Sequence, residues 1–398
     1  MNLSDVFSDV AVKELTSVDI PRRGSNQHEI NGTAPLRNFF KTNEKIKGPI
    51  KWHYFADDHE IAYEEGEFTF YDARLRSADI TGRTEWRGYY TGDFLSVANP
   101  GDVLILAKTR DGELHGLLFE HGSNWLRCAA LLLNLPELSI RYQVLSEAEL
   151  TAAKVELTRQ LILEELGVAV PVTYKLNDED LMLATFGKTI PDTRTMARFA
   201  RDQIEIDPRN ADTALVRLLE RETELFYALE RVLVQEQLDA KFDSVDHFLA
   251  YSISIQQRRK ARRGWSLQHH LEFIFTFNKL KFQSQAKTEA KSRPDFLFPG
   301  QREYHDVAFD DGLLVMLAAK STAKERWRQV LAEADRIALK HLCTLEPAIS
   351  VDQTSEMRRQ SVQLVVPEVL FDTYAPKQRE QLMTINNFIE LVRRKQRN

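Results

Sequence analysis

The sequence predicts two kinds of domain in one chain, a mainly β domain followed by an α/β domain. Three observations lead to this expectation. Residues 50 to 120 hold short β-rich runs broken by turn residues, and residues 145 to 255 show helical periodicity. From residue 266 onward, helices alternate with short apolar strands, which indicates a partly parallel sheet flanked by helices. With 398 residues, 43% of them hydrophobic, the chain can form two or three domains with cores of their own.

The β-rich part predicts an antiparallel sheet or barrel. Its expected strands are 50–57 (IKWHYFAD), 66–75 (GEFTFYDARL), 102–109 (DVLILAKT) and 114–122 (LHGLLFEHG), with 109–113 (TRDGE) as a hairpin turn. Two loops, 21–32 and 74–88, are polar and basic, and each is a candidate binding loop or simply a solvated surface. The candidate residues in these loops are Arg22, Arg23, Asn26, His28, Arg74, Arg76 and Arg83.

The helical part begins with an expected helix over 146–166 and continues with another over 211–238. Between them, residues 187–210 are polar and contain two prolines. We therefore expect a first domain over 1–145, a linker over 146–186 and a second domain over 187–398.

The α/β part predicts strands and helices in alternation. The expected helices are 266–280, 323–340 and 350–360, and the expected strands are 294–298, 313–319, 341–345 and 362–366. Ligands of such sheets gather at the strand ends.

Composition excludes several classes of protein. The net charge of −6 gives no general attraction to nucleic acid, so any such binding must come from local basic clusters. Cys128 and Cys343 are far apart and lack Cys or His neighbours, which argues against a disulfide framework or a thiolate zinc site. No signal-like or membrane-spanning apolar segment appears, so we expect a cytoplasmic protein.

The α/β part also carries residues suited to phosphodiester hydrolysis. That reaction needs divalent metal held by carboxylates, a nearby water and a cation that stabilises the developing negative charge. Asp295 opens one expected strand and Lys320 ends the next, which is the layout of the PD-(D/E)xK nuclease core. Ala318 stands where this core has a second acid, so that carboxylate must come from elsewhere. Hard oxygen ligands suit Mg²⁺.

Glu333 is the favoured second carboxylate. On the expected helix it lies beside the apolar face and can point along the sheet edge toward Asp295. A solvated helix carboxylate is the alternative. Glu325 has an alternative of its own, because Thr322 and Glu325 have capping-box spacing, although a helix start also favours phosphate.

A basic cluster, residues 258–263 (RRKARR), precedes the expected helix at 266. Five cations in six residues favour phosphate or base contacts over a solvated helix end. Its candidate DNA contacts are Arg258, Arg259 and Arg262. Glu272 follows on the helix and is either a third carboxylate or an ordinary surface residue.

Several blocks resemble, in order and spacing, the catalytic domain of the EcoRII-type restriction endonucleases, from about residue 187 to the C-terminus. They are 258–272, 293–306, 317–337, 341–345, 356–367 and 382–389. Segments 15–32, 84–90 and 101–108 are similar to that family's N-terminal effector domain, a DNA-binding pseudobarrel.

The resemblance implies roles for individual residues. Asp295 and Glu333 would bind the metal, Lys320 would be the catalytic lysine and Tyr304 an active-site tyrosine. The segment that reads G·C pairs would comprise Lys324, Glu325 and Arg326. Arg259 and its neighbours would contact the centre of the site. The family has an acid where this chain has Gln268, so either Gln268 or Glu272 occupies the helix-carboxylate position.

The resemblance also implies a Mg²⁺-dependent type II restriction endonuclease that cuts double-stranded DNA at a CCWGG-like site. A near-palindromic site favours a homodimer, and the N-terminal domain would bind a second site as an allosteric effector. Two alternatives stay open: a DNA-binding regulator with a decayed nuclease core, and a nuclease of this family with a different or methylated target.

Overall fold

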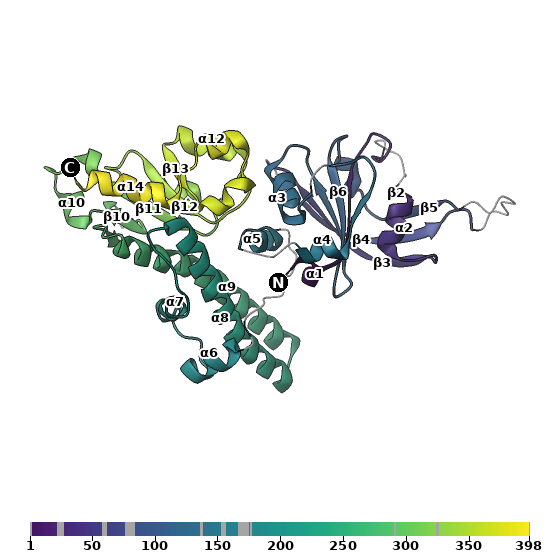
Figure 1. Cartoon of the computed structure of the whole chain (residues 1–398), viewed down its shortest axis with the longest axis horizontal. Coiled ribbons are helices and arrows are strands. Elements are labelled where there is room, and N and C mark those ends of the chain that lie inside the picture. The colour runs from purple at the N-terminus through teal and green to yellow at the C-terminus, as the bar shows by residue number, and fades with distance from the viewer. Residues whose placement is uncertain are drawn as a thin grey trace. The chain divides into compact units, whose positions relative to one another are not determined.

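The structure is a computed structural model of the chain. It describes residues 2–21, 28–57, 62–75, 84–135, 138–152, 157–165, 175, 177–289, 292–323 and 326–397. The chain divides into two compact units, each with its own sheet (Figure 1). The first contains Met1–Pro171, Pro347–Ser350 and Asp372–Ala375, and the second contains the remainder.

The first unit is built on an eight-stranded sheet of order β2-β5-β4-β3-β7-β6-β1-β8. The strands are β1 (Phe7–Glu14), β2 (Glu29–Gly32), β3 (Ile46–Phe55), β4 (Ala62–Asp72), β5 (Trp86–Tyr90), β6 (Val103–Thr109), β7 (Leu114–Phe119) and β8 (Gln143–Leu145). Neighbouring strands are antiparallel except β3 and β7, which are parallel. The predicted mainly β domain and its β6–β7 hairpin are confirmed. The sequence analysis missed β1, whose residues are buried on both faces and therefore lack clean alternation.

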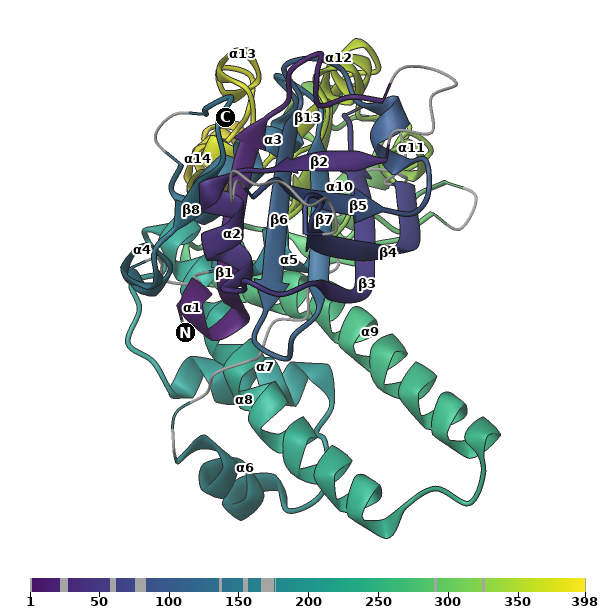
Figure 2. The same cartoon turned by 90° about the vertical axis from the view of Figure 1, so that its right-hand side faces the viewer.

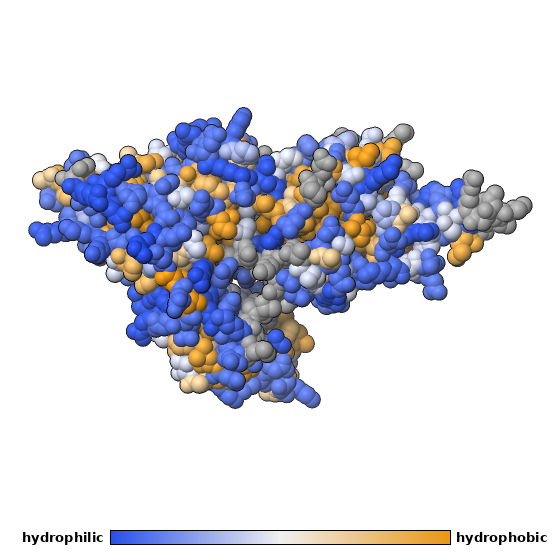
Figure 3. All heavy atoms as spheres, in the orientation of Figure 1, coloured by the Kyte–Doolittle hydropathy of each residue, from blue (hydrophilic) through white to orange (hydrophobic). Residues whose placement is uncertain are grey.

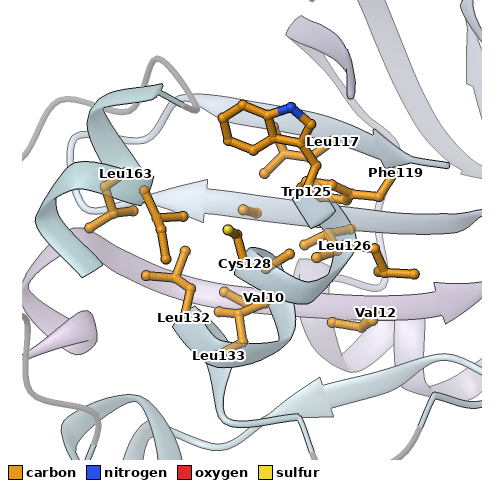
Figure 4. Packing of buried hydrophobic residues seen from close by; sticks show 14 of the residues in the cluster. Val10, Val12, Leu117, Phe119, Trp125, Leu126, Cys128, Leu132, Leu133 and Leu163 are labelled. Carbon is orange, nitrogen blue, oxygen red and sulfur yellow. The ribbon is translucent and has the colours of Figure 1, made fainter. Parts of the chain in front are cut away.

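Helices cover this sheet. They are α1 (Leu3–Val6), α2 (Ala34–Phe40), the 3-10 turn η1 (Phe94–Val97), α3 (Asn124–Leu133), α4 (Glu147–Ala152) and α5 (Leu157–Glu165). The Ser123 side chain caps α3 by accepting from the Leu126 amide at 3.0 Å. Trp125 and Cys128 of α3 then pack onto Val10 and Phe119 of the sheet (Figure 4). Cys128 is thus a buried apolar residue, as is Cys343 in the second unit.

The second unit begins with helices. These are α6 (Asp178–Phe186), α7 (Thr193–Asp202), α8 (Ala211–Ala240) and α9 (Val245–Phe277). Helices α8 and α9 form a long hairpin (Figure 2), and Asn210 and Ser244 cap their N-termini. The helix expected over 266–280 is only the end of α9, which also contains the 258–263 cluster. That cluster therefore lies on a helix rather than before one.

The second unit then forms a five-stranded sheet of order β13-β12-β11-β10-β9. Its strands are β9 (Gln283–Ser284), β10 (Phe296–Phe298), β11 (Val315–Lys320), β12 (Lys340–Thr344) and β13 (Val362–Val365). β11, β12 and β13 are parallel, whereas β9 and β10 are antiparallel to their neighbours. The remaining helical segments are α10 (Gln301–His305), η3 (Asp311–Leu313), α11 (Trp327–Val330), α12 (Val351–Arg359), η4 (Glu368–Thr373), α13 (Pro376–Arg379) and α14 (Ile385–Lys395). The predicted α/β domain with a partly parallel sheet is confirmed.

Aromatic packing holds α9 and α14 against one face of this sheet. Phe275 of α9 and Phe388 of α14 both contact Phe298 of β10, with ring centroids 5.5 and 5.6 Å apart. Phe275 also meets Phe296 at 5.2 Å. These contacts fix β10, which carries the residue that follows the Pro-Asp pair.

The prediction of a helix over 323–340 is wrong. Residues Trp327–Val330 form α11, and turns follow it up to β12. Ala334 has φ +53°, a left-handed conformation that a helix interior does not contain. Periodicity alone did not reveal this turn because its backbone bonds go to distant side chains.

Within the described ranges, no helix is both long and apolar enough to cross a membrane. The face seen in Figure 3 is largely hydrophilic, with apolar atoms in small groups among charged ones.

Candidate active site

Strand register brings Asp295 and Lys320 together. In the antiparallel β10–β11 pair Phe296 is opposite Leu317, so Asp295, one residue earlier, lies opposite Ala318. Alternate residues of a strand share a face, and therefore Ala318 and Lys320 face the same side. Asp295 Oδ2 accepts from Lys320 Nζ at 3.0 Å. Lys320 ends β11 as expected, and Asp295 lies immediately before β10, which pairs with β11.

Two further hydrogen bonds fix the Asp295 carboxylate, which is 8% exposed. Oδ2 accepts from the Ala319 amide at 2.7 Å, and Oδ1 accepts from Gln285 Nε2 at 2.8 Å. The carboxylate therefore has a defined orientation at the start of β10.

Glu333 is the residue that the sequence analysis favoured as the second carboxylate. It lies in the turn after α11, and burial raises its pKa to about 7. Asp295 also raises this pKa, whereas Lys320 and Lys340 lower it, so the Glu333 carboxyl lies within the electrostatic field of the Asp295–Lys320 pair. Its Oε2 atom is buried and has no hydrogen-bond partner among the residues that the structure describes. Asp295 and Lys320 are thus in direct contact, and Glu333 interacts with both electrostatically.

This arrangement fits a hard divalent cation. Asp295 and Glu333 could supply carboxylate oxygens, since within the described ranges Glu333 Oε2 has no hydrogen-bond partner. Among the described residues, no group of three His, Cys, Asp or Glu side chains is arranged to hold a metal. A site of two carboxylates completed by water and substrate phosphate suits Mg²⁺, which binds in that manner.

Tyr304 is buried, and its hydroxyl is hydrogen-bonded to other residues. It is 1% exposed, and its hydroxyl donates to the Glu289 carboxylate and accepts from the Arg336 amide at 3.2 Å. Burial raises the pKa of this phenol. The expected active-site role stays a prediction, and the hydroxyl contacts the turn that carries Glu333.

Gln268, rather than Glu272, connects to Asp295. Gln285 Nε2 lies 3.5 Å from Gln268 Oε1 and donates to Asp295. Glu272 instead pairs with Arg194 of α7 at 3.1 Å. The helix position nearest the metal site therefore carries an amide, and the expected catalytic role of Glu272 has no support from its contacts.

Two arginines of the 258–263 cluster form ion pairs and ring contacts with α8. Arg262 is 5% exposed, lies 3.4 Å from Glu222 and stacks on Phe226 at 4.6 Å. Arg259 pairs with Glu230 at 2.6 Å and stacks on Tyr227 at 4.7 Å. Arg262 is thus a packing residue, which corrects its assignment as a DNA contact. Arg258 is exposed.

The other candidate DNA contacts have mixed outcomes. Arg326 is exposed at the N-terminus of α11. Arg74 pairs with Glu85 at 2.7 Å, and His28 lies 3.9 Å from Asp93. Outside the described residues lie Arg22, Arg23, Asn26, Arg76, Arg83, Lys324 and Glu325.

The sequence analysis missed three residues around the site. Gln285 bonds Asp295, Glu289 bonds Tyr304, and Lys340 donates to the Glu333 carbonyl. Each is an ordinary polar residue in its own segment. A signal was present only for Lys340, a lysine at the first position of a fully buried strand.

The fold and the site define a class of domain. An aspartate at the start of β10 bonds a lysine at the end of β11, and two parallel strands continue the sheet. That is the arrangement of the PD-(D/E)xK nuclease core. Residues 226–389, less than half of the chain, match the family model described as EcoRII C terminal.

A curated relative matches part of the chain. The type II restriction enzyme EcoRII of Escherichia coli is 45% identical over 169 residues, which are 42% of this chain and 42% of that protein. The match thus spans less than half of that relative's length.

Solved structures resemble the chain in part. Metal-depleted Ecl18kI in complex with uncleaved, modified DNA gives a TM-score of 0.45 at 16% identity, covering 55% of this chain and 84% of that one. A complex of the restriction endonuclease PspGI with substrate DNA gives 0.43 at 15%, covering 57% and 97%.

Proposed function

We propose that this protein is a Mg²⁺-dependent type II restriction endonuclease that hydrolyses phosphodiester bonds of double-stranded DNA at a short specific site. One observation carries the proposal: the bonded Asp295–Lys320 pair, with Glu333 in its electrostatic field, lies within residues 226–389, which match the EcoRII C terminal family model.

The residues divide the chemistry among them. Asp295, oriented by the Ala319 amide and Gln285, would hold the metal together with Glu333. When bound, Mg²⁺ would lower the pKa of a bound water and neutralise part of the phosphate charge. The Lys320 ammonium stabilises the negative charge that develops on the phosphoryl oxygens. Water attacks the phosphorus in line, and the 3′-oxygen leaves, which gives a 5′-phosphate end.

The substrate proposal follows the relative with 45% identity, a type II restriction enzyme. We propose a CCWGG-like target, read in part by the segment that ends at Arg326. Cutting both strands of such a site favours a homodimer with twofold symmetry. A DNA substrate of this kind agrees with a cytoplasmic location.

A plasmid that carries CCWGG sites tests the activity. With Mg²⁺, the protein should leave discrete fragments, and the Asp295→Asn variant should leave the plasmid intact. A DNA-binding regulator with a decayed core would shift the plasmid on a gel without cutting it. Sequencing the ends of a digested genome would show whether the target is CCWGG, a different site or a methylated one.

We further propose that the N-terminal domain, residues 1–145, binds a second DNA site as an allosteric effector. The division into two compact units supports a separable catalytic domain. The proposed catalytic range of 187–398 should be extended to include α6, because Asp178 of α6 forms a buried ion pair with Arg221 of α8 at 2.7 Å. A fragment that begins at residue 175 should preserve or increase cleavage. A folded but inactive fragment would contradict the effector role.

A further inference from the structure

The turn that carries Glu333 is held by side chains from other segments. It has neither helical nor strand structure, and Ala334 within it has φ +53°. A non-glycine residue in this conformation persists only when its surroundings impose it. The surrounding contacts therefore determine where the Glu333 carboxylate lies.

Lys340 holds the first half of the turn. It is 6% exposed, and its Nζ donates to the Glu333 carbonyl at 2.5 Å and to the Ala334 carbonyl at 2.6 Å. Burial lowers the pKa of this lysine, while the nearby carboxylates of Asp335, Glu289 and Glu333 raise it. Lys340 thus links the first strand residue of β12 to the backbone that precedes the strand.

Glu289 and Tyr304 hold the second half. Glu289 Oε2 accepts from the Asp335 amide at 3.1 Å, while its Oε1 accepts from the Tyr304 hydroxyl. The same hydroxyl accepts from the Arg336 amide at 3.2 Å. Two consecutive backbone amides are therefore bonded by one carboxylate–phenol pair.

Arg336 connects this pair back to the segment that carries Tyr304. Its guanidinium donates to the Tyr304 carbonyl, to the Asp306 carbonyl at 3.0 Å and to the Phe309 carbonyl at 2.9 Å. The turn and the α10 region are thus joined by bonds in both directions.

We propose that Glu289 is a positioning residue for the metal-binding carboxylate of Glu333, acting through Tyr304 and the amides of residues 335 and 336. The inference rests on the proposed function, because it assumes that Glu333 binds the metal. No described residue forms a hydrogen bond with Glu333 Oε2, so the placement of this carboxylate depends on its backbone. Outer partners of metal ligands commonly change metal affinity about 10- to 100-fold.

The test uses the intact chain without DNA. Glu289→Gln removes the charge that both donors share, and Tyr304→Phe removes the hydroxyl alone. Glu390→Gln is the matched control, because Glu390 is an exposed carboxylate paired with Arg393 on α14. Mg²⁺ affinity is measured by titration calorimetry, and amide hydrogen exchange is followed in a peptide that spans residues 331–339.

Both site variants should bind Mg²⁺ about tenfold more weakly and exchange the amides of residues 335 and 336 faster. Glu390→Gln should match the wild type in both measurements. A thermal unfolding scan identifies a variant that fails to fold, and the other variant then decides. Wild-type exchange and wild-type Mg²⁺ affinity in a folded Glu289→Gln or Tyr304→Phe protein would overturn the inference.

The inference and the proposed function fail in different ways. If the wild type cuts DNA while both variants bind Mg²⁺ normally, the positioning role is wrong and the nuclease proposal stands. If the wild type binds Mg²⁺ but cuts no DNA, the nuclease proposal is wrong, and calorimetry and exchange still decide the role of Glu289. If the wild type binds no Mg²⁺, the metal site and its positioning residue are both wrong.

Discussion

Lys320 Nζ lies 3.0 Å from Asp295 Oδ2, although the two residues are 25 positions apart in the chain. The antiparallel pairing of β10 with β11 creates this contact. It places a cation and a carboxylate on one side of the sheet, beside the small side chain of Ala318. A phosphodiester that approaches this edge would meet both groups together.

Removing the lysine charge should stop cleavage while the fold survives. Lys320→Gln should lower the cleavage rate by roughly 10²- to 10³-fold, the usual cost of losing one stabilising donor. Single-turnover cleavage of a short duplex measures the effect. Lys377→Gln, at an exposed lysine of α13, is the control and should cut at the normal rate. Normal cleavage by Lys320→Gln would mean that another group stabilises the charge.

Mg²⁺ affinity should rise with pH near neutrality. Burial raises the pKa of Glu333 to about 7, so much of this carboxyl is protonated at pH 6 in the metal-free protein. A metal ligand must lose its proton, and the affinity should therefore increase from pH 6 to pH 8, by up to about tenfold per unit below the pKa. Calorimetric titrations without DNA measure it. Glu333→Gln should bind Mg²⁺ more weakly and with much less pH dependence; an unchanged pH profile would contradict Glu333 as the ligand.

Substitutions at Arg262 and Arg258 should affect the free energy of unfolding differently, although both residues belong to one basic cluster. Arg262→Met leaves the buried Glu222 with fewer partners and should lower the free energy of unfolding by about 2 kcal/mol or more. Arg258→Ala, at an exposed position, should leave stability within about 0.5 kcal/mol.

DNA affinity distinguishes these two residues further. If Arg258 contacts a phosphate, Arg258→Ala should weaken binding and reduce the slope of log affinity against log salt by about 1. Denaturant unfolding and salt-dependent gel shifts measure the two effects. A strong loss of stability in Arg258→Ala would contradict its exposed placement.

Stability should fall between pH 6.5 and pH 4 in part because of His341. Burial lowers the pKa of His341 to about 4, and the positive charge of Lys395 contributes. Over that range the unfolded chain takes up a proton that the folded chain does not, so the free energy of unfolding decreases as the pH falls. The contribution is on the order of 1 to 3 kcal/mol at pH 4. In urea unfolding, His341→Leu should show a flatter pH dependence, and His305→Gln, at an exposed histidine, should not.

Residue patterns predicted the secondary structure well where one physical cause dominates. The apolar runs that became β10, β11, β12 and β13 were visible because each is buried and bounded by polar residues. Asp295 and Lys320 could be proposed because Asp295 directly precedes one such run and Lys320 ends the next. The prediction failed at 323–340. Helical periodicity continues there, but hydrogen bonds from Lys340, Glu289 and Tyr304 to backbone groups stabilise a turn.

The sequence by itself determined the two kinds of domain, the strand pair and the pair of residues at its edge. These features depend on the order of apolar and polar residues within short segments of the chain. Only the tertiary structure decided that Arg262 packs against α8, that Gln268 rather than Glu272 connects to Asp295, and that Tyr304 bonds the Glu333 turn. Each of these outcomes joins side chains from distant segments, and their energies depend on distances and burial that exist only after the chain has folded.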